Sequence, residues 1–490
     1  MSAVCVPAQE SAPREATSSP AGPIDGAAAI RLPPARTLPR FAQTAWFGLR
    51  PIEFNLKSLA HFGDVWQISL LSRKDPFVVT SHPDHVESLF KAKPDDAPSI
   101  TGDSPLRPIL GPSSVLTSVG ERHMRQRKLL LPPFHGESVQ RYVEMISTVA
   151  EREIDRWPVG EPFALAPRMQ AVTLDVIMSG IFGIVGSPAR GTPEYRLRQT
   201  IRMLLRGSTN PLYRVLELQN VSRREPTRIL ASLLGLVDRQ LFALIDARRR
   251  NQDSEQHDVL SLLLEARDEE GQPLSDRELR DELMALVLAG HETTANSIAW
   301  TLERLLRTPA PYARLRESVR SDDASEGEGY VEATIHEAMR VRPVVPMIGR
   351  YVMRPWRLGE YVVPTGSPVA ISIVALHHRE DVYPDPHAFR PERFLGSKQP
   401  DDPGAEQKGE AGCRAFRKPG TYTWIPFGGG IRRCLGASLA MAEQRIVLGA
   451  IARRTDLVAP DQAPEPARQR NVTTIPGRGG RVIVQHKHPD

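Results

Sequence analysis

Residues 427–436 read Phe-Gly-Gly-Gly-Ile-Arg-Arg-Cys-Leu-Gly, and this stretch decides how the rest of the chain is interpreted. Its glycines permit backbone conformations closed to other residues and a close approach to a flat group. The run after it, residues 437–443, is rich in helix formers, so Cys434 should stand at the start of a helix. The positive end of that helix, with Arg432 and Arg433 nearby, favours a thiolate. Such a thiolate is a soft ligand suited to iron, and the alternative is a structural cysteine on a tight turn.

The spacing Phe-x-x-Gly-x-Arg-x-Cys-x-Gly resembles the haem-binding signature of the cytochrome P450 family. Its fixed positions are occupied by Phe427, Gly430, Arg432, Cys434 and Gly436. The resemblance implies heme b (iron protoporphyrin IX) with Cys434 as the axial thiolate, and it implies that Phe427, Arg432 and Gly436 contact this cofactor. It also implies a mainly α, single-domain triangular fold with small β-sheets.

Composition is ordinary for a globular protein: 490 residues, 40% hydrophobic and 25% charged. No Pro/Gly/Ser-rich linker divides the middle of the chain, so residues 31–490 are expected to form one domain. Three scattered cysteines are too few for a disulfide framework and fit a reducing compartment. A net charge of +5 is mild for this length and does not indicate nucleic-acid binding.

The first 30 residues are rich in Ala, Pro, Ser and Glu, and we expect them to be disordered. They contain no signal peptide, and no stretch approaches the roughly 18 consecutive apolar residues of a membrane span. The chain therefore resembles the bacterial-type, cytoplasmic members of the family, without an integral membrane anchor, and a monomer is expected.

Periodicity predicts short strands over residues 63–79 and 357–373, and a last hairpin over 472–484 around Pro476-Gly477. From about Gly120 the chain is predicted to be mostly helical. Residues 396–420 are polar and rich in Pro and Gly, which predicts a long loop before the cysteine segment.

A long central helix is predicted between Ser275 and Thr308. Ser275 and Glu278 form a capping box, and Thr308-Pro309 is a stop signal. About 33 residues at 1.5 Å each would cross the molecule. Residues 283–290 are apolar on all sides, which indicates burial.

That buried stretch ends in the polar sequence Ala-Gly-His-Glu-Thr-Thr at residues 289–294. A mid-helix glycine and a buried carboxylate both destabilise a helix, so they indicate a function. Ala289 and Gly290 leave room for a flat cofactor and a diatomic ligand, and the hydroxyl of Thr293 can bend the helix. The resemblance makes Glu292 and Thr293 the catalytic acid-alcohol pair that relays protons during dioxygen cleavage. The alternative is a polar kink in a core helix.

Glu337 and Arg340 lie one helical turn apart, a spacing common in surface ion pairs. Their order, with Arg393 about 50 residues later, resembles a buried structural triad of the family. We expect the three residues to hold the core beside the cysteine loop.

The propionates of haem need cationic or hydrogen-bonding partners. Four residues match family positions for this role: His123, Arg127, Arg350 and Arg432. Each could instead be a solvated surface charge.

The resembled family binds its electron donor on the side of the thiolate, and basic residues there would form a docking face for an acidic donor. They are Arg122, Arg125, Lys128 and Arg433. The resemblance implies ferredoxin and ferredoxin reductase as electron donors, fed ultimately by NAD(P)H, although a solvated helix face would have the same composition.

The predicted function is that of a haem-thiolate monooxygenase, which uses dioxygen to hydroxylate or epoxidise a lipophilic small molecule. The pocket is predicted to draw on residues 98–115, 200–221, 344–348 and 473–474, beside Ala289. Substrate identity does not follow. A peroxide-driven enzyme and a non-enzymatic haem sensor or ligand-sequestering protein remain alternatives, although neither needs the pair Glu292-Thr293.

Overall fold

A computed structural model describes residues 21–395 and 420–489, apart from 27–28, 72, 74, 105, 135–136, 185, 187, 208–222, 224, 251–257 and 322–323. The predictions for residues 1–20, Cys5, Cys413, most of the 396–420 loop and most of the 200–221 segment lie outside the described residues. The helices are α1 (Arg40–Leu49), α2 (Pro51–Phe62), α3 (Pro83–Lys91), α4 (Arg107–Leu110), α5 (Gly120–Leu130), α6 (Glu137–Gln140), α7 (Val143–Asp155), α8 (Leu165–Phe182), α9 (Pro193–Gly207), α11 (Arg228–Arg250), α12 (Val259–Glu265), α13 (Asp276–Leu306), α14 (Pro309–Arg320), α15 (Ala324–Val341), α16 (Ile373–Leu376) and α17 (Ala437–Arg454). Short 3-10 turns are η1 (Ile100–Asp103), η2 (Pro132–Phe134), η3 (Pro391–Phe394) and η4 (Gly430–Arg432). The strands are β1 (Gly22–Pro23), β2 (Val65–Ile68), β3 (Phe77–Thr80), β4 (Pro162–Ala164), β5 (Met347–Tyr351), β6 (Trp356–Leu358), β7 (Tyr361–Val363), β8 (Pro368–Ser372), β9 (Thr455–Val458), β10 (Ala467–Arg470), β11 (Thr473–Pro476) and β12 (Arg481–Lys487).

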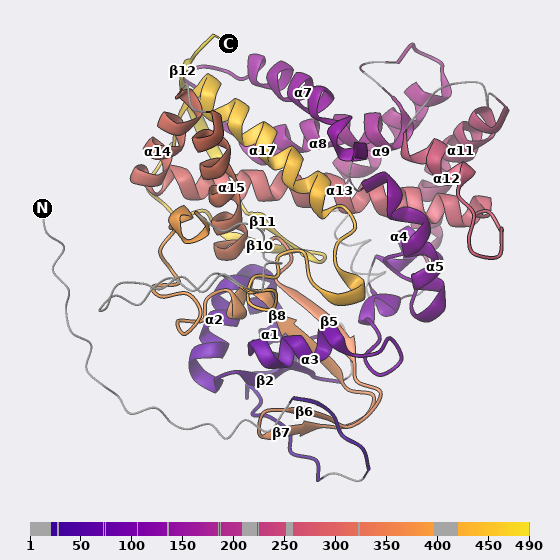
Figure 1. Ribbon diagram of the computed structural model, residues 1–490, viewed down its shortest axis with the longest axis vertical. Helices are drawn as coiled ribbons and strands as arrows, with labels where there is room; N and C mark the ends of the chain where they lie inside the picture. Colours follow the sequence, from indigo (N-terminus) through magenta and orange to yellow (C-terminus); the bar gives the residue numbers. More distant parts are fainter. Residues whose placement is uncertain are drawn as a thin grey trace, which may run out of the picture.

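The predicted mainly α architecture with small sheets is confirmed (Figure 1). The largest sheet has the order β2-β3-β8-β5, with β3 and β8 parallel and the other pairs antiparallel. Two three-stranded sheets, β1-β6-β7 and β4-β12-β9, and the hairpin β10-β11 complete the β-structure. Within the described residues, no helix is both long enough and apolar enough to cross a membrane.

Helix α13 forms as the sequence predicts. Ser275 caps it, accepting from the backbone N–H of Glu278, while the Glu278 side chain accepts from the backbone N–H of Ser275. The helix crosses the molecule between the helical layer of α7, α8 and α17 and the β-rich part (Figure 1). Its apolar middle is buried, with Leu283 and Met284 in one core cluster with residues of α8. A buried helix of this length provides a rigid support for polar groups in its middle.

The predicted hairpin over residues 472–484 is wrong. The last hairpin pairs β11 with the preceding β10, while β12 joins β4 and β9 in another sheet. Asn471 makes the turn with a φ of 50°, and Gly479 and Gly480, also at positive φ, redirect the chain before β12. The segment expected to be disordered up to residue 30 is ordered in part, because Gly22 and Pro23 pair with β6.

Candidate functional site

The cysteine loop, residues 427–436, contains η4 and folds back on itself just before α17 begins. The backbone N–H of Cys434 donates to the carbonyl oxygen of Phe427 over 2.9 Å, which closes the loop. The ring of Phe427 lies edge-on to Trp424, with centroids 6.4 Å apart. Helix α17 begins directly after Gly436, so the predicted cysteine at the mouth of a helix is confirmed.

The three successive glycines of this loop are required mainly by the neighbouring helix α3. Gly428 and Gly430 have φ of 69° and 62°, which only glycine adopts without strain. A Cβ atom at Gly429 would lie 2.3 Å from the Phe90 ring, and one at Gly430 would lie 2.4 Å from the Phe90 carbonyl oxygen. At Gly436, by contrast, a Cβ would meet no atom within 4 Å. The glycines therefore seat the loop on α3 and leave the side of Gly436 open.

The side chain of Cys434 is exposed to solvent, yet enough protein surrounds the sulfur to desolvate a thiolate. Burial raises the pKa of the thiol, and the backbone N–H of Gly436, Arg127 and Arg433 oppose this effect only in part. The expectation that the loop by itself favours the thiolate is therefore corrected. The positive charges act in the predicted direction, but desolvation of the thiolate outweighs them.

The predicted propionate partners converge in one cationic cluster, made of His123, Arg127, Arg350 and Arg432. Three of them, His123, Arg350 and Arg432, line the same pocket between α3 and the cysteine loop. Burial, together with the charges of Arg432, Arg127 and Arg350, lowers the pKa of His123 to about 3. Burial likewise lowers the pKa of Arg350 to about 10. His123 and Arg350 are buried, and Arg127 and Arg432 lie partly exposed beside them, so the four share one positively charged environment.

Among the described residues, no carboxylate pairs with the arginines of this cluster. Arg127 donates to the carbonyl of Arg433 and Arg350 to the carbonyl of Gly349. Arg432 donates to the carbonyls of Val115 and Ser118 over 3.1 and 2.5 Å. Buried charge without a counter-charge is strongly unfavourable, so this cluster fits a group that brings negative charge. A dianionic haem meets that requirement.

Helix α13 presents its polar segment as predicted, but Gly290 has a different role. Ala289 is exposed in an otherwise buried helix, and the hydroxyl of Thr293 donates to the Ala289 carbonyl over 2.5 Å. A Cβ at Gly290 would instead lie 2.9 Å from Cδ1 of Ile177 on α8, so this glycine allows two helices to pack closely. The space on the other face of α13 is left by Ala289.

The carboxylate of Glu292 lies beside a guanidinium that local sequence does not predict. Oε1 of Glu292 is 3.4 Å from Nη1 of Arg470, the last residue of β10, and both side chains are largely buried. Arg470 stands in the sequence Arg-Gln-Arg-Asn, which looks like a solvated turn. Nothing in the local pattern signals its neighbour on α13.

The structure turns the predicted charged scaffold into a buried network. Arg340 and Glu337 form a bidentate pair with both distances 2.7 Å and no exposure, and Nε of Arg393 lies 3.4 Å from the same carboxylate. Arg340 also donates to the carbonyl of His377, whose Nε2 accepts from the backbone N–H of Ile425. The network therefore supports the segment that leads into the cysteine loop.

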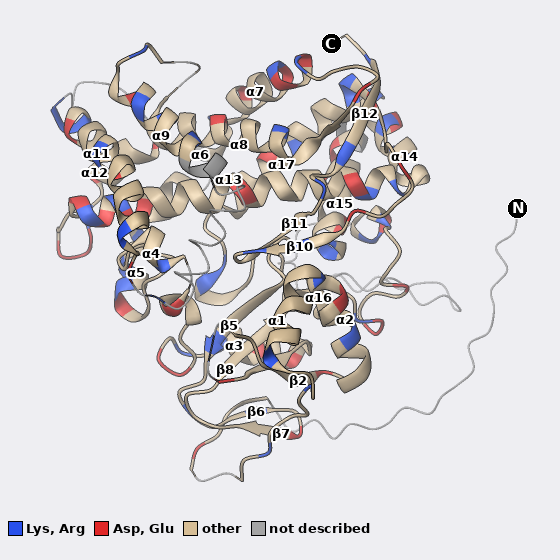
Figure 2. Cartoon of the chain, turned by 180° about the vertical axis from the view of Figure 1, so that it is seen from behind, with Lys and Arg blue, Asp and Glu red and all other residues tan. Residues whose placement is uncertain are grey.

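The predicted basic docking face is smaller than the sequence suggests. Arg125 pairs with Asp268 and Glu278 over 2.7 and 2.9 Å, and Lys128 pairs with Glu269 over 2.6 Å. Acidic and basic residues accordingly lie together around α5 (Figure 2). Arg122 and Arg433 remain as exposed members of the predicted face.

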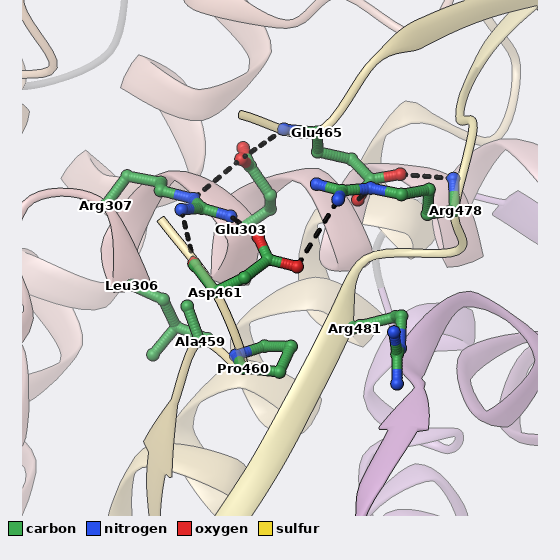
Figure 3. A pocket seen from close by; sticks show the side chains of 9 residues that line it. All are labelled: Glu303, Leu306, Arg307, Ala459, Pro460, Asp461, Glu465, Arg478 and Arg481. Atoms are coloured by element: carbon green, nitrogen blue, oxygen red, sulfur yellow. Dashed lines mark hydrogen bonds and ion pairs between the residues drawn. The ribbon is translucent and has the colours of Figure 1, made fainter. Parts of the chain in front are cut away.

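A second charged hollow lies at the other end of α13, where its charges neutralise one another (Figure 3). Arg307 lies 3.4 Å from Glu303, and Arg478 lies 3.3 Å from Asp461 and 3.4 Å from Glu465. Through these ion pairs, the hollow fastens the base of the β10-β11 hairpin to α13.

Comparisons with known proteins agree with this arrangement. The family model of cytochrome P450 matches residues 32–483. Putative cytochrome P450 137 of Mycobacterium tuberculosis is 36% identical over 441 residues, covering 87% of this chain and 84% of its own length. Putative cytochrome P450 138 of Mycobacterium bovis is 32% identical, covering 96% and 99%. The solved structure of retinoic acid-bound cyanobacterial CYP120A1 has a TM-score of 0.72 and 24% identity, and it covers 94% of this chain and all of its own.

The fold and the site together define a haem monooxygenase. The chain belongs to the cytochrome P450 family. Members of this family hold haem through a cysteine thiolate, and the residues of the present site fit that group.

Proposed function

We propose that this protein uses haem, ligated by the Cys434 thiolate, to insert one oxygen atom of dioxygen into a lipophilic organic substrate. The observation that carries the proposal is the partly buried cationic cluster of His123, Arg127, Arg350 and Arg432 beside Cys434, which is without a carboxylate partner among the described residues. The propionates would bind there, and Ala289 would leave space on the opposite face. When bound, haem supplies the reductive activation of dioxygen.

The residues of α13 would supply protons. Glu292 is an acid in a largely buried position, and Thr293 holds its hydroxyl against the backbone of its own helix. An acid and an alcohol adjacent in sequence can pass a proton from solvent into a dry site. A peroxide-driven enzyme and a haem sensor have little use for this pair, which favours the monooxygenase.

The substrate pocket would be formed where three predicted segments meet. The backbone N–H of Thr474 donates to the carbonyl of Val344 over 2.6 Å, and Nε1 of Trp300 on α13 donates to the carbonyl of Thr474. A Cβ at Gly349 would lie 2.3 Å from Ile100, so β5 also touches the 98–115 segment. Retinoic acid, the ligand of the structural neighbour, is a suitable first probe in a spin-state screen of lipophilic compounds.

Electrons would come from a ferredoxin-type donor that binds near Arg122 and Arg433. Replacing Arg433 with Gln should lower the rate at which an acidic ferredoxin reduces the protein. In the parent protein, added salt should also lower this rate.

The variant Thr293→Ala tests the oxygenase proposal. Loss of the hydroxyl should divert much of the consumed NAD(P)H into hydrogen peroxide, while substrate binding is retained. If product formation remains fully coupled to NAD(P)H consumption, the proton relay is refuted and a peroxide-driven reaction becomes the better account.

A further inference from the structure

The β10-β11 hairpin follows α13 and is attached to it at three places. At its base, the backbone N–H of Glu465 donates to Glu303 over 3.4 Å, and Arg478 holds Glu465 (Figure 3). In its middle, Trp300 donates to the Thr474 carbonyl over 3.0 Å. At its tip, Arg470 reaches Glu292. The contacts step along α13 from residue 303 to residue 292 as the hairpin runs from base to tip.

These attachments fix where the Arg470 guanidinium lies. Arg470 is paired with Thr473 in the hairpin ladder, and the Thr473 hydroxyl donates to the Arg470 carbonyl over 2.9 Å. Asn471, at positive φ, holds the turn beside it. A side chain on a strand that is attached to α13 at its base and middle has little freedom to leave Glu292.

The geometry of the pair suits an acid that must be held in place. Nη1 of Arg470 lies within ion-pair distance of Oε1 of Glu292, at 3.4 Å, so the guanidinium attracts the carboxylate. Arg470 is 12% exposed and Glu292 23%, and in such surroundings the attraction is stronger than at an open surface.

We propose that Arg470 is a positioning residue for proton delivery: from the tip of the hairpin it holds the Glu292 carboxylate beside Thr293. The proposal rests on the proposed function of Glu292. It adds a partner from the C-terminal hairpin to a relay otherwise confined to α13. Since Thr473 and Thr474 of the same hairpin are predicted to line the substrate pocket, one element would serve both substrate and acid.

The test compares Arg470→Gln with Arg468→Gln and Arg478→Gln in the haem-loaded enzyme. Arg468 is an exposed arginine on the same strand, while Arg478 anchors the hairpin base without reaching Glu292. Arg470→Gln should raise the hydrogen peroxide formed per NAD(P)H severalfold and enlarge the solvent deuterium isotope effect. Arg470→Lys should restore most of the coupling, and Arg468→Gln should behave like the parent. Coupling in Arg478→Gln should change less than in Arg470→Gln.

A second arm separates positioning from loosening of the hairpin. In a Glu292→Gln background, Arg470→Gln should add no further uncoupling, and the thermal midpoints of the single and double variants should be non-additive. Full coupling in Arg470→Gln, or equal uncoupling with and without Glu292, would overturn the proposal. If Glu292→Gln itself stays fully coupled, the relay fails instead, and Arg470 has no acid to position.

Discussion

The scaffold around Glu337 and the cationic cluster beside Cys434 are two groups of arginines that differ in the source of their counter-charge. In the scaffold, Arg340 and Arg393 share the carboxylate of Glu337, and Arg340 also donates to several backbone carbonyls. In the cationic cluster, Arg350 and Arg432 donate only to carbonyls, and no carboxylate of the described chain pairs with them. The scaffold is complete within the protein, whereas the cluster has no counter-charge from the described chain and would be completed by the proposed haem. The same residue type thus forms a structural network in one place and the proposed binding site in the other.

The largest effect is expected from breaking the scaffold around Glu337. Glu337→Gln leaves Arg340 buried without its counter-charge, which should lower the free energy of unfolding by about 3–5 kcal/mol. The control is Glu332→Gln on the same helix, because Glu332 is exposed and pairs with exposed Arg445. That change should cost less than about 1 kcal/mol. Denaturant midpoints of both variants measure the difference, and equal midpoints would contradict the assignment of Glu337.

Glu282 is a buried acid, in contrast to the basic residues of the cationic cluster, and its ionisation can be tested by pH. Glu282 on α13 is fully buried and accepts from the backbone N–H of Val115 over 3.0 Å. Burial, followed by the nearby charges of Asp281 and Glu278, raises the pKa of its carboxyl to about 8. The unfolded chain loses this proton near pH 4.5 while the folded protein keeps it, so stability falls as pH rises from about 4.5 to 8.

At pH 7, Glu282 should lower the free energy of unfolding by on the order of 3 kcal/mol, compared with a pH at which it is protonated in both the folded and the unfolded state. Glu282→Gln keeps an acceptor for Val115 and should remove this part of the slope in unfolding free energy against pH. A slope unchanged in the variant would mean that Glu282 is ionised in the folded protein.

A smaller and more selective effect is expected from a change in the cationic cluster. Arg350→Gln removes one cation that has no carboxylate partner in the described chain, so haem affinity should fall by about 1.5–3 kcal/mol. The stability of the haem-free protein should stay the same or rise, because the remaining charges repel one another less. Haem transfer to an acceptor protein and thermal unfolding of the haem-free form measure the two quantities. If Arg350→Gln destabilised the haem-free protein as strongly as Glu337→Gln does, the distinction between the cationic cluster and the scaffold would be contradicted.

Local sequence predicted those parts whose cause is local. The capping box at Ser275, the helix after Gly436 and the polar break at residues 289–294 depend on neighbours along the chain, and the structure has them where predicted. The partner of β11 is not predicted correctly, because Pro476-Gly477 and Asn471 are competing turn signals. The choice between them depends on the sheet that β12 joins, which local sequence does not contain.

The remaining features depend on contacts between distant segments. The need for glycine at 290 comes from Ile177 on α8, and at 429 from Phe90 on α3. The partner of Glu292 comes from Arg470 on a hairpin near the C-terminus. The basic face of α5 is reduced by Asp268 and Glu269, which the sequence leaves in a separate loop. No window of sequence contains both members of such pairs.

The central claim is that Cys434 supplies the thiolate to a haem held by the cationic cluster. The most direct test is the absorption spectrum of the purified, haem-containing protein after reduction and addition of carbon monoxide, beside that of Cys434→Ser. The account predicts a strongly red-shifted Soret band in the parent protein and its loss in the variant. An unshifted band in the native parent protein, or a shifted band that persists in Cys434→Ser, would contradict it.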